Sequence, residues 1–508
     1  MKNRIYTTAS AVTALSIAER GLGFLYRIVL SRLLGAEGLG LYQVALSVFG
    51  FFLTFGTGGI PISVSRMISK NKAENNLKGE SGAVSAGLTL CLLLTLPVCL
   101  LFLLFGSKMQ FLFSDERCVE IFYILLLGLV FSALYAVIRG YFWGNKQLLL
   151  PSVLEIAEES VMVIAGVLLL QNISSPMSGA KNAAWAVVIS YFFSFTASIL
   201  CFLWKGGKLS NPKKQLKPLF NATLPITSVR ASSSFVNSAI AVLLPVMLIR
   251  SGLSETEALK LFGIVSGMVI PILFIPSTVI GSISLVLVPE LSEDFYRKNY
   301  ARLRKSIYYG LKSSIFIACI LIPFFYALGD ELGQIAFANQ TAGVLIRTGS
   351  ILLLPISLTI ISTGFLNALG FEKQTFVYYF VGAIALLFCI VLLPAICGIY
   401  SYIIGLFASF TLNAVCNLLL LAKKCPKTQK QGEQVRVQEF FLPILFILPL
   451  SLLGDLLDTL LSPFFGELTS VLASSLLLSV LTLVLYVAFR LFSIKSLFIK
   501  TKNSFTIK

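Results

Sequence analysis

Long apolar runs separated by short clusters of charged residues make up almost the whole chain. About 20 apolar residues are enough for a helix to cross a bilayer, and most of these runs reach that length. No stretch alternates between apolar and polar residues over the roughly 10 positions that a strand of a transmembrane barrel needs. The pattern therefore predicts an all-α polytopic membrane protein.

The charge clusters and the Gly, Pro and Asn residues between the runs predict fourteen transmembrane helices. The predicted spans are 7–33, 41–65, 82–106, 119–138, 148–170, 183–204, 219–249, 261–289, 306–328, 341–366, 375–396, 398–422, 438–461 and 467–489. Because fourteen is even, both termini are expected on the same side of the membrane.

The Lys and Arg residues that connect these spans are unevenly distributed. Connections on the side of the termini carry 29 of them, whereas the opposite connections carry 5. Cytoplasmic loops carry the excess of Lys and Arg in membrane proteins, so we expect both termini in the cytoplasm. One span too many or too few would invert much of this imbalance, which is why the count also favours fourteen.

Composition excludes several classes of function. The chain has 508 residues, of which 57% are hydrophobic and only 12% charged, so a soluble fold is excluded. The net charge of +17 comes from residues beside the spans, which argues against a nucleic-acid partner. The sequence contains no His, and its nine Cys residues form no C-x-x-C motif. We therefore expect no metal site, no disulfide framework and no catalytic residue.

Weak collinear similarities at an offset of 210 to 226 residues indicate an internal repeat. Gly144-Asn145-Lys146-Gln147, for example, corresponds to Gly370-Phe371-Glu372-Lys373-Gln374, and Arg20 corresponds to Arg230. Six helices per copy give parallel repeats, related by an axis along the membrane normal. The predicted division is an N-lobe at 1–205, a linker at 206–217, a C-lobe at 218–422, a basic linker at 423–437, two further helices at 438–491 and a basic tail at 492–508.

Six cations fall inside predicted spans, where an uncompensated charge costs several kcal/mol. Arg20 and Arg27 are seven residues apart and therefore share one helix face. With Arg230 as the repeat partner of Arg20, we expect a cationic chamber suited to phosphate, and Arg347 is a further candidate. The alternative is that these arginines pair with acids and only fix helix packing. Arg32 and Lys312 lie close enough to span ends to reach the interface.

Acidic residues also lie within the spans. Glu155, Glu158 and Glu159 share one face of the fifth span, and Glu19 directly precedes Arg20. They are either ion-paired within the bundle or a coupling site at which one carboxyl binds H⁺ or Na⁺. No resident cofactor is otherwise expected.

Proline and glycine residues mark candidate hinges in two repeat-matched spans. Gly59 and Pro61 interrupt the second span, and Pro271 and Pro276 interrupt the eighth. Such residues weaken a helix locally and allow a transporter to bend when it changes the side to which it opens.

The segment Ala18-Glu19-Arg20-Gly-Leu-Gly-Phe-Leu-Tyr-Arg27-Ile-Val-Leu-Ser-Arg32-Leu-Leu-Gly-Ala-Glu37-Gly-Leu-Gly-Leu-Tyr42 resembles the opening of a known family. It is similar to the polysaccharide and lipid-linked oligosaccharide flippases of the multidrug/oligosaccharidyl-lipid/polysaccharide exporter superfamily. The branch of stage V sporulation protein B is the nearest in pattern, and the lipid II flippases are relatives. The lipid II flippases have the second of their two span 1 arginines at the position of Tyr26 in this sequence. They also have an arginine in span 8, at the position of Pro271.

The resemblance implies an alternating-access carrier in the bacterial plasma membrane, acting as a monomer among membrane lipids. It would move an undecaprenyl-diphosphate-linked saccharide, a peptidoglycan precursor or an exopolysaccharide unit, from the inner to the outer leaflet. A cation-coupled multidrug exporter of the same superfamily is one alternative, and a membrane glycosyltransferase or polymerase is another. The short outer connections argue against the glycosyltransferase or polymerase, and we expect no enzyme activity.

Overall fold

The computed structural model describes residues 2–171, 173–425 and 443–461, together with separate positions between 469 and 484. Every regular element among these residues is a helix, and none of them forms a strand. Within the described ranges, ten stretches are helical, long and apolar enough to cross a membrane. The all-α membrane fold is therefore confirmed. The count of fourteen stays a prediction, because most of the predicted span 467–489 lies outside the described residues.

The chain divides into two compact units. The first comprises residues up to Met268 together with Pro394–Gly398, and the second begins at Val269. The predicted linker at 206–217 lies within the first unit, because the helix that follows it packs against the unit's first three helices. The division into six-helix repeats stays a prediction, as do the other predicted domain limits.

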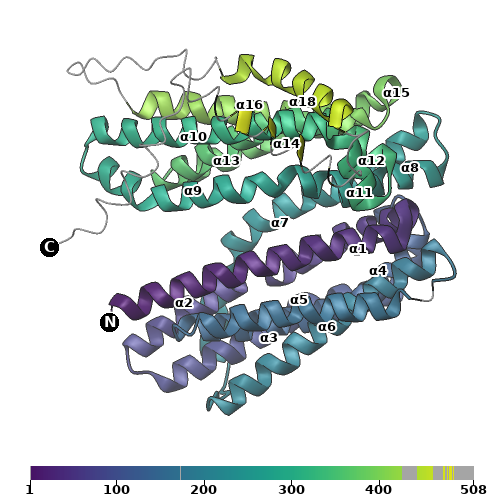
Figure 1. Ribbon diagram of the computed structural model, residues 1–508. Coiled ribbons are helices and arrows are strands. Elements are labelled where there is room, and N and C mark those ends of the chain that lie inside the picture. Colours follow the sequence, from purple (N-terminus) through teal and green to yellow (C-terminus); the bar gives the residue numbers. More distant parts are fainter. Residues whose placement is uncertain are drawn as a thin grey trace. The chain divides into compact units, whose positions relative to one another are not determined.

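The first unit contains the purple to teal helices of Figure 1. They are α1 (Lys2–Thr57), α2 (Ile60–Ala73), α3 (Leu77–Phe105), α4 (Arg117–Gly144), α5 (Leu149–Leu169), α6 (Pro176–Trp204), α7 (Lys213–Arg250) and α8 (Glu255–Gly263). The helices α4 and α6 pack along each other, and α1 contacts α4, α5, α6, α7 and α8. Buried residues such as Val64, Val137 and Phe142 form the core between α2, α3 and α4.

Helix α1 is two helices joined by a sharp turn. Gly35 lies inside it with φ 66° and ψ 178°, a conformation open almost only to glycine. The two predicted spans 7–33 and 41–65 therefore lie on either side of this residue. After the turn, Gly40 lies against the backbone of Leu259 in α8, and Gly263 of α8 lies against Ala36. Glycine at both contact points lets the two backbones approach closely.

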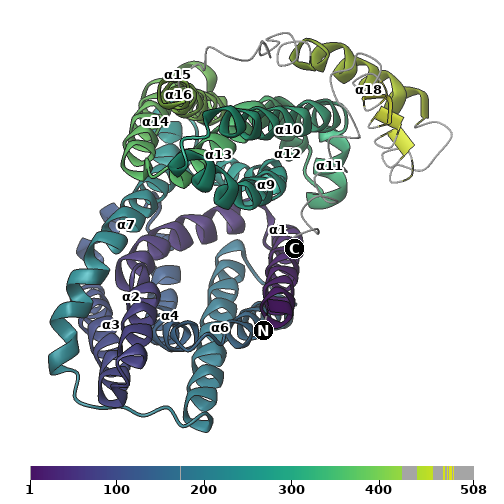
Figure 2. The same ribbon diagram turned by 90° about the vertical axis from the view of Figure 1, so that its left-hand side faces the viewer.

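The second unit contains α9 (Ile270–Tyr296), α10 (Tyr300–Ala327), α11 (Gly329–Phe337), α12 (Gln340–Gly349), α13 (Leu353–Ala368), α14 (Glu372–Leu392), α16 (Tyr400–Lys424) and α18 (Ile447–Leu461), shown in green and yellow in Figure 2. Its largest pairings are α14 with α16 and α9 with α13. Leu303, Phe365 and Leu366 are fully buried in its core. A short π-helical segment, Ile264–Val269, precedes α9. Pro271 lies in the first turn of α9, and Pro276 lies inside α9.

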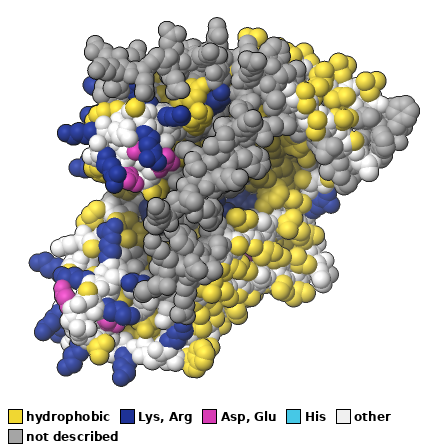
Figure 3. All heavy atoms as spheres, turned by 60° about the vertical axis from the view of Figure 1, so that its left-hand side comes forward, with side chains coloured by type: hydrophobic (Ala, Val, Ile, Leu, Met, Phe, Trp, Pro, Cys, Tyr) yellow, Lys and Arg dark blue, Asp and Glu magenta, His cyan; other side chains and the backbone are white. Residues whose placement is uncertain are grey.

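Figure 3 shows Lys and Arg side chains gathered at one end of each unit, next to a broad hydrophobic surface. Exposed leucines such as Leu100, Leu103 and Leu104 line α3. Apolar side chains that face outward along a whole helix are expected where lipid, and not water, is the neighbour. The chain is therefore a multi-pass membrane protein, and the cytoplasmic placement of the termini stays a prediction.

Candidate functional site

Two arginines lie exposed on the first half of α1. Arg20 and Arg27 differ by two helical turns, so both point from one face. Among the residues that the structure describes, neither side chain forms an ion pair or hydrogen bond. These two predicted substrate-binding residues are thus accessible cations without an acid at ion-pair distance.

A carboxylate lies against the same helix between the two arginines. A Cβ atom added to Gly23 would lie 2.8 Å from Glu159 Oε1, so only a glycine leaves room for this side chain in its present position. Gly23 is three residues after Arg20 and four before Arg27, which places it on their face. Glu159, expected at a coupling site, therefore lies beside the cationic face of α1.

The other predicted coupling acids line a cavity of about 240 Å³ within the first unit. Its wall comes from α1, α4, α5 and α6. The lining residues are Glu19, Leu53, Thr57, Ser132, Tyr135, Ala136, Arg139, Glu155, Glu158 and Tyr191. Three carboxyl groups against one guanidinium make this a predominantly acidic cavity.

Arg139 is the one cation among these lining residues. Its Nη1 donates a hydrogen bond to Glu155 Oε1 at 3.0 Å, and its guanidinium lies 5.1 Å from the centre of the Trp143 ring. Arg139 Nε, Tyr135 Oη and Glu158 Oε2 are buried with no hydrogen-bond partner in the described part of the chain. Buried polar atoms in proteins nearly always have partners, so these three fit a cavity that receives water or a polar ligand.

Sequence reasoning missed Arg139 because the predicted fourth span ended at residue 138. Helix α4 continues to Gly144, so Arg139 lies more than one turn inside it. The signal was present: no helix-breaking pair occurs before Gly144-Asn145, and Trp143 marks an interfacial position.

Arg230, the third predicted substrate-binding residue, lies on α7. Its side chain is exposed, yet its Nη1 donates a hydrogen bond to the Gly58 carbonyl at 3.0 Å. Gly58 and Gly59 separate α1 from α2, with Pro61 in the first turn of α2. The helix is therefore interrupted at the predicted hinge residues Gly59 and Pro61, whose movement is untested.

Arg347 belongs to the second unit. Its guanidinium pairs with Asp330 at 3.2 Å and with Asp455 at 2.6 Å, and lies 4.6 Å from the centre of the Tyr326 ring. Asp455 belongs to α18, so this cluster holds α18 to α11 and α12. The contacts correspond to the ion-paired alternative for Arg347, and its role in substrate binding stays a prediction.

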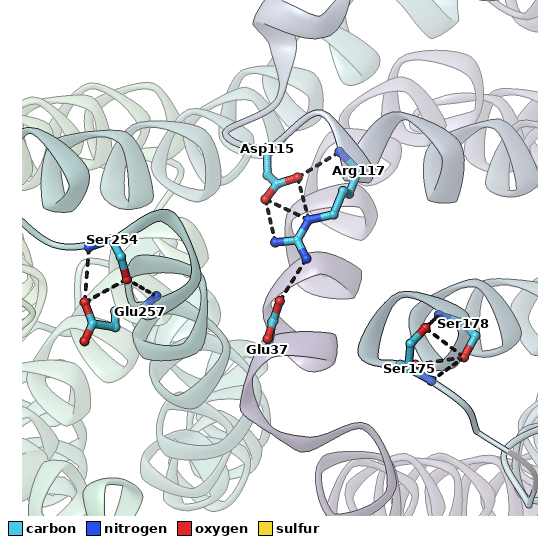
Figure 4. Close-up of polar contacts among 7 residues, drawn as sticks. All are labelled: Glu37, Asp115, Arg117, Ser175, Ser178, Ser254 and Glu257. Carbon is cyan, nitrogen blue, oxygen red and sulfur yellow. Dashed lines mark hydrogen bonds and ion pairs between the residues drawn. The ribbon is translucent and has the colours of Figure 1, made fainter.

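A second polar cluster lies at the turn of α1 (Figure 4). Arg117, at the start of α4, donates to Glu37 Oε1 at 2.8 Å and to Asp115 Oδ2 at 2.9 Å. Glu37 follows the turn at Gly35, so the cluster ties the second half of α1 to the start of α4. The same view shows the capping boxes of α6, formed by Ser175 and Ser178, and of α8.

Comparison with known proteins identifies relatives of this chain. The profile of the family described as "Polysaccharide biosynthesis protein" matches residues 6–295. Stage V sporulation protein B of Bacillus subtilis (strain 168) is 26% identical, over 66% of this chain and 67% of the relative. Lipid II flippase MurJ of the same organism is 22% identical, over 62% of this chain and 63% of the relative.

The fold also matches a solved structure of lipid II flippase MurJ in an inward closed conformation. The TM-score is 0.73 at 14% identity, covering 94% of this chain and 99% of that chain. An inward-facing structure of a multidrug resistance MATE family transporter of the MOP superfamily shares the fold as well, with a TM-score of 0.68 at 14% identity, covering 80% of this chain and 94% of that chain. None of these relatives is named as an enzyme, in agreement with the sequence expectation. Because the family profile matches more than half of the sequence, the chain belongs to the polysaccharide biosynthesis protein family.

Proposed function

We propose that this protein is a flippase that moves an undecaprenyl-diphosphate-linked saccharide from the inner to the outer leaflet of the bacterial plasma membrane. It works by alternating access, as a monomer with both termini in the cytoplasm. The family, and a relative that is itself named a lipid II flippase, support this proposal.

The exposed cationic face of α1 is the observation that carries the proposal. A guanidinium without a partner is costly inside a membrane unless it faces water or an anion. Arg20 and Arg27 are seven residues apart, roughly 10 Å along the helix, a distance that two extended Arg side chains can close on one diphosphate. Guanidinium groups bind phosphate oxygens in pairs and keep their charge at every physiological pH. Arg230 supplies a third exposed cation in the same unit.

The acidic cavity is the site that we assign to the coupling ion, H⁺ or Na⁺. Glu19, Glu155 and Glu158 bring three carboxyl groups to one cavity, while Arg139 neutralises one of them. A cation that enters the cavity meets the unpartnered oxygen of Glu158. Neutralising that carboxyl removes the cost of a buried charge, and this gives the ion a means of stabilising one conformation over another.

The test is transfer between leaflets in vesicles containing the purified full-length protein and a labelled undecaprenyl-diphosphate saccharide. The variants R20A and R27A should each slow transfer about ten- to a hundredfold, because a hydrogen bond to a charged group contributes about 1.5–3 kcal/mol. The variant R297A is the matched control, since it removes a guanidinium from an exposed pair with Glu293. Equal transfer by protein-containing and empty vesicles would exclude the flippase.

The acidic cavity also favours a second candidate, a cation-coupled multidrug exporter. Such an exporter binds cationic compounds, for which three carboxyl groups are suitable neighbours. The same vesicles loaded with a cationic dye separate the two candidates. Dye transport that depends on Glu158 and does not depend on Arg20 would support the exporter, whereas the flippase predicts lipid transfer that depends on Arg20 and no transport of the dye.

A further inference from the structure

The break between α1 and α2 is held by side chains of another helix. Gly58 and Gly59 lie between the end of α1 at Thr57 and the start of α2 at Ile60. Pro61 has no N–H group, so the carbonyl of Thr57 has no donor four residues later. The Gly58 N–H still donates to the Thr54 carbonyl, and the Gly59 carbonyl accepts from the Ser63 N–H. The Gly58 carbonyl and the Gly59 N–H take their partners from another helix.

Helix α7 provides those partners from one face. The Gly59 N–H donates to Thr227 Oγ1 at 3.0 Å, and Arg230 Nη1 donates to the Gly58 carbonyl at 3.0 Å. Thr227 and Arg230 are three residues apart, so they lie on the same side of α7. One side chain accepts from the break and the other donates to it.

The fit at this point is close, and the opposing helix is itself irregular. A Cβ atom at Gly59 would lie 2.6 Å from the Thr223 carbonyl, so a larger residue would force the helices apart. Helix α7 contains Pro225 within the same turn, which removes one of its own hydrogen bonds. Two weakened helices therefore meet where the polar contacts are made.

The two contacts differ in their exposure. Thr227 is buried, and its bond to Gly59 is enclosed. Arg230 is exposed and uses one of its five N–H donors on an uncharged carbonyl. A phosphate oxygen accepts a charge-assisted hydrogen bond, about twice as strong as one to a neutral acceptor. An anionic ligand within reach would therefore compete with Gly58 for this guanidinium.

We propose that Arg230 is a positioning residue that links occupancy by the lipid diphosphate to the break between α1 and α2. In the protein without ligand, Arg230 stabilises the break by donating a hydrogen bond to the Gly58 carbonyl. The diphosphate draws the guanidinium away, so the break keeps the Thr227 contact but loses the one to Arg230, and it bends more easily. This inference rests on the proposed function, since it needs a diphosphate as ligand.

Hydrogen–deuterium exchange of the full-length protein in lipid nanodiscs tests the inference. The measured segment is 54–66, with undecaprenyl diphosphate as ligand and undecaprenol, which lacks the phosphates, as its control. In the parent protein, the diphosphate lipid should raise exchange about fivefold, the size expected for the loss of one ordinary hydrogen bond. Undecaprenol should leave it unchanged.

Two variants separate a link from a merely structural contact. In R230Q, a neutral amide can still donate to Gly58 but cannot attract a diphosphate strongly, so exchange should stay low with either lipid. In T227V, which removes the acceptor for Gly59, exchange should be raised without ligand while the lipid still binds. A response in R230Q equal to that of the parent would overturn the inference.

Binding of the lipid, followed in the same nanodiscs by native mass spectrometry, distinguishes the two proposals. If the parent binds undecaprenyl diphosphate and exchange at 54–66 does not change, the link is wrong and the flippase stands. If the parent does not bind it, the proposed function fails and the link fails with it.

Discussion

The close approach of α1 and α8 predicts that adding one methyl group has opposite effects on stability at two glycines of α1. A Cβ atom at Gly40 would lie 2.2 Å from the Leu259 carbonyl oxygen, whereas one at Gly50 would meet nothing within 4 Å. Both glycines lie in the second half of α1. The variants G40A and G50A therefore make the same chemical change in the same helix.

The expected energies follow from these distances. An ordinary contact is about 3.4 Å, so G40A must move the two backbones apart by about 1.2 Å, and backbone cannot rotate away as a side chain can. Overpacking of this kind costs about 1–3 kcal/mol. Alanine is favoured over glycine in a helix by about 1 kcal/mol, which offsets part of that cost in G40A and acts alone in G50A. We expect a net loss of up to about 2 kcal/mol for G40A and a gain of up to about 1 kcal/mol for G50A.

Tryptophan fluorescence during thermal unfolding in detergent measures this difference. The chain has three Trp residues, Trp143, Trp185 and Trp204, and all lie in the first unit, so the signal reports the unit that contains the contact. G40A should lower the unfolding temperature and G50A should leave it equal or raise it. Shifts of the same sign and size in both variants would contradict the backbone contact between α1 and α8.

Three further perturbations have defined outcomes. G35V places a branched residue at φ 66° and should cost about 1–3 kcal/mol in the same assay, so an unchanged unfolding temperature would exclude the turn there. D455N removes one of the two acids that bind Arg347, so amide hydrogen exchange in α18 should be faster than in the parent protein, while exchange in α14 stays unchanged. Exchange in α18 equal to that of the parent would show that the pair does not hold α18. R139A leaves the half-buried carboxylate of Glu155 unpaired and should cost about 2–3 kcal/mol, part of which E155Q restores in the double variant; strictly additive losses would rule out the pair.

The apolar pattern predicted the helices well because the membrane demands about 20 apolar residues per span. It predicted two spans on either side of Gly35, and the structure places them there, with glycine as the turn residue. Apolar pattern alone could not reveal that Gly40 and Gly263 serve a close backbone contact, because that contact joins residues more than 200 positions apart. The grouping of α7 with the first unit likewise depends on contacts with α1, α2 and α3, which are distant in sequence.

The sequence predicts which residues belong to the candidate site better than it predicts how they are arranged in space. Helical spacing placed Arg20 and Arg27 on one face, because a seven-residue interval is fixed by helix geometry. Spacing also placed Glu158 and Glu159 near each other, yet they face different surroundings, one a cavity and the other the backbone at Gly23. A charged residue at the end of an apolar run predicts the end of a span, yet Arg139 lies within α4 because it pairs with Glu155.

Affinity for undecaprenyl diphosphate, measured on the purified protein with and without both α1 arginines, tests the central claim most directly. We expect the parent to bind the lipid and R20A/R27A to bind it at least about a hundredfold more weakly, since two charge-assisted contacts are lost. The control R297A should bind as the parent does, and none of the three proteins should bind undecaprenol. Equal affinity of the parent and R20A/R27A for the diphosphate lipid would contradict a substrate site on the cationic face of α1.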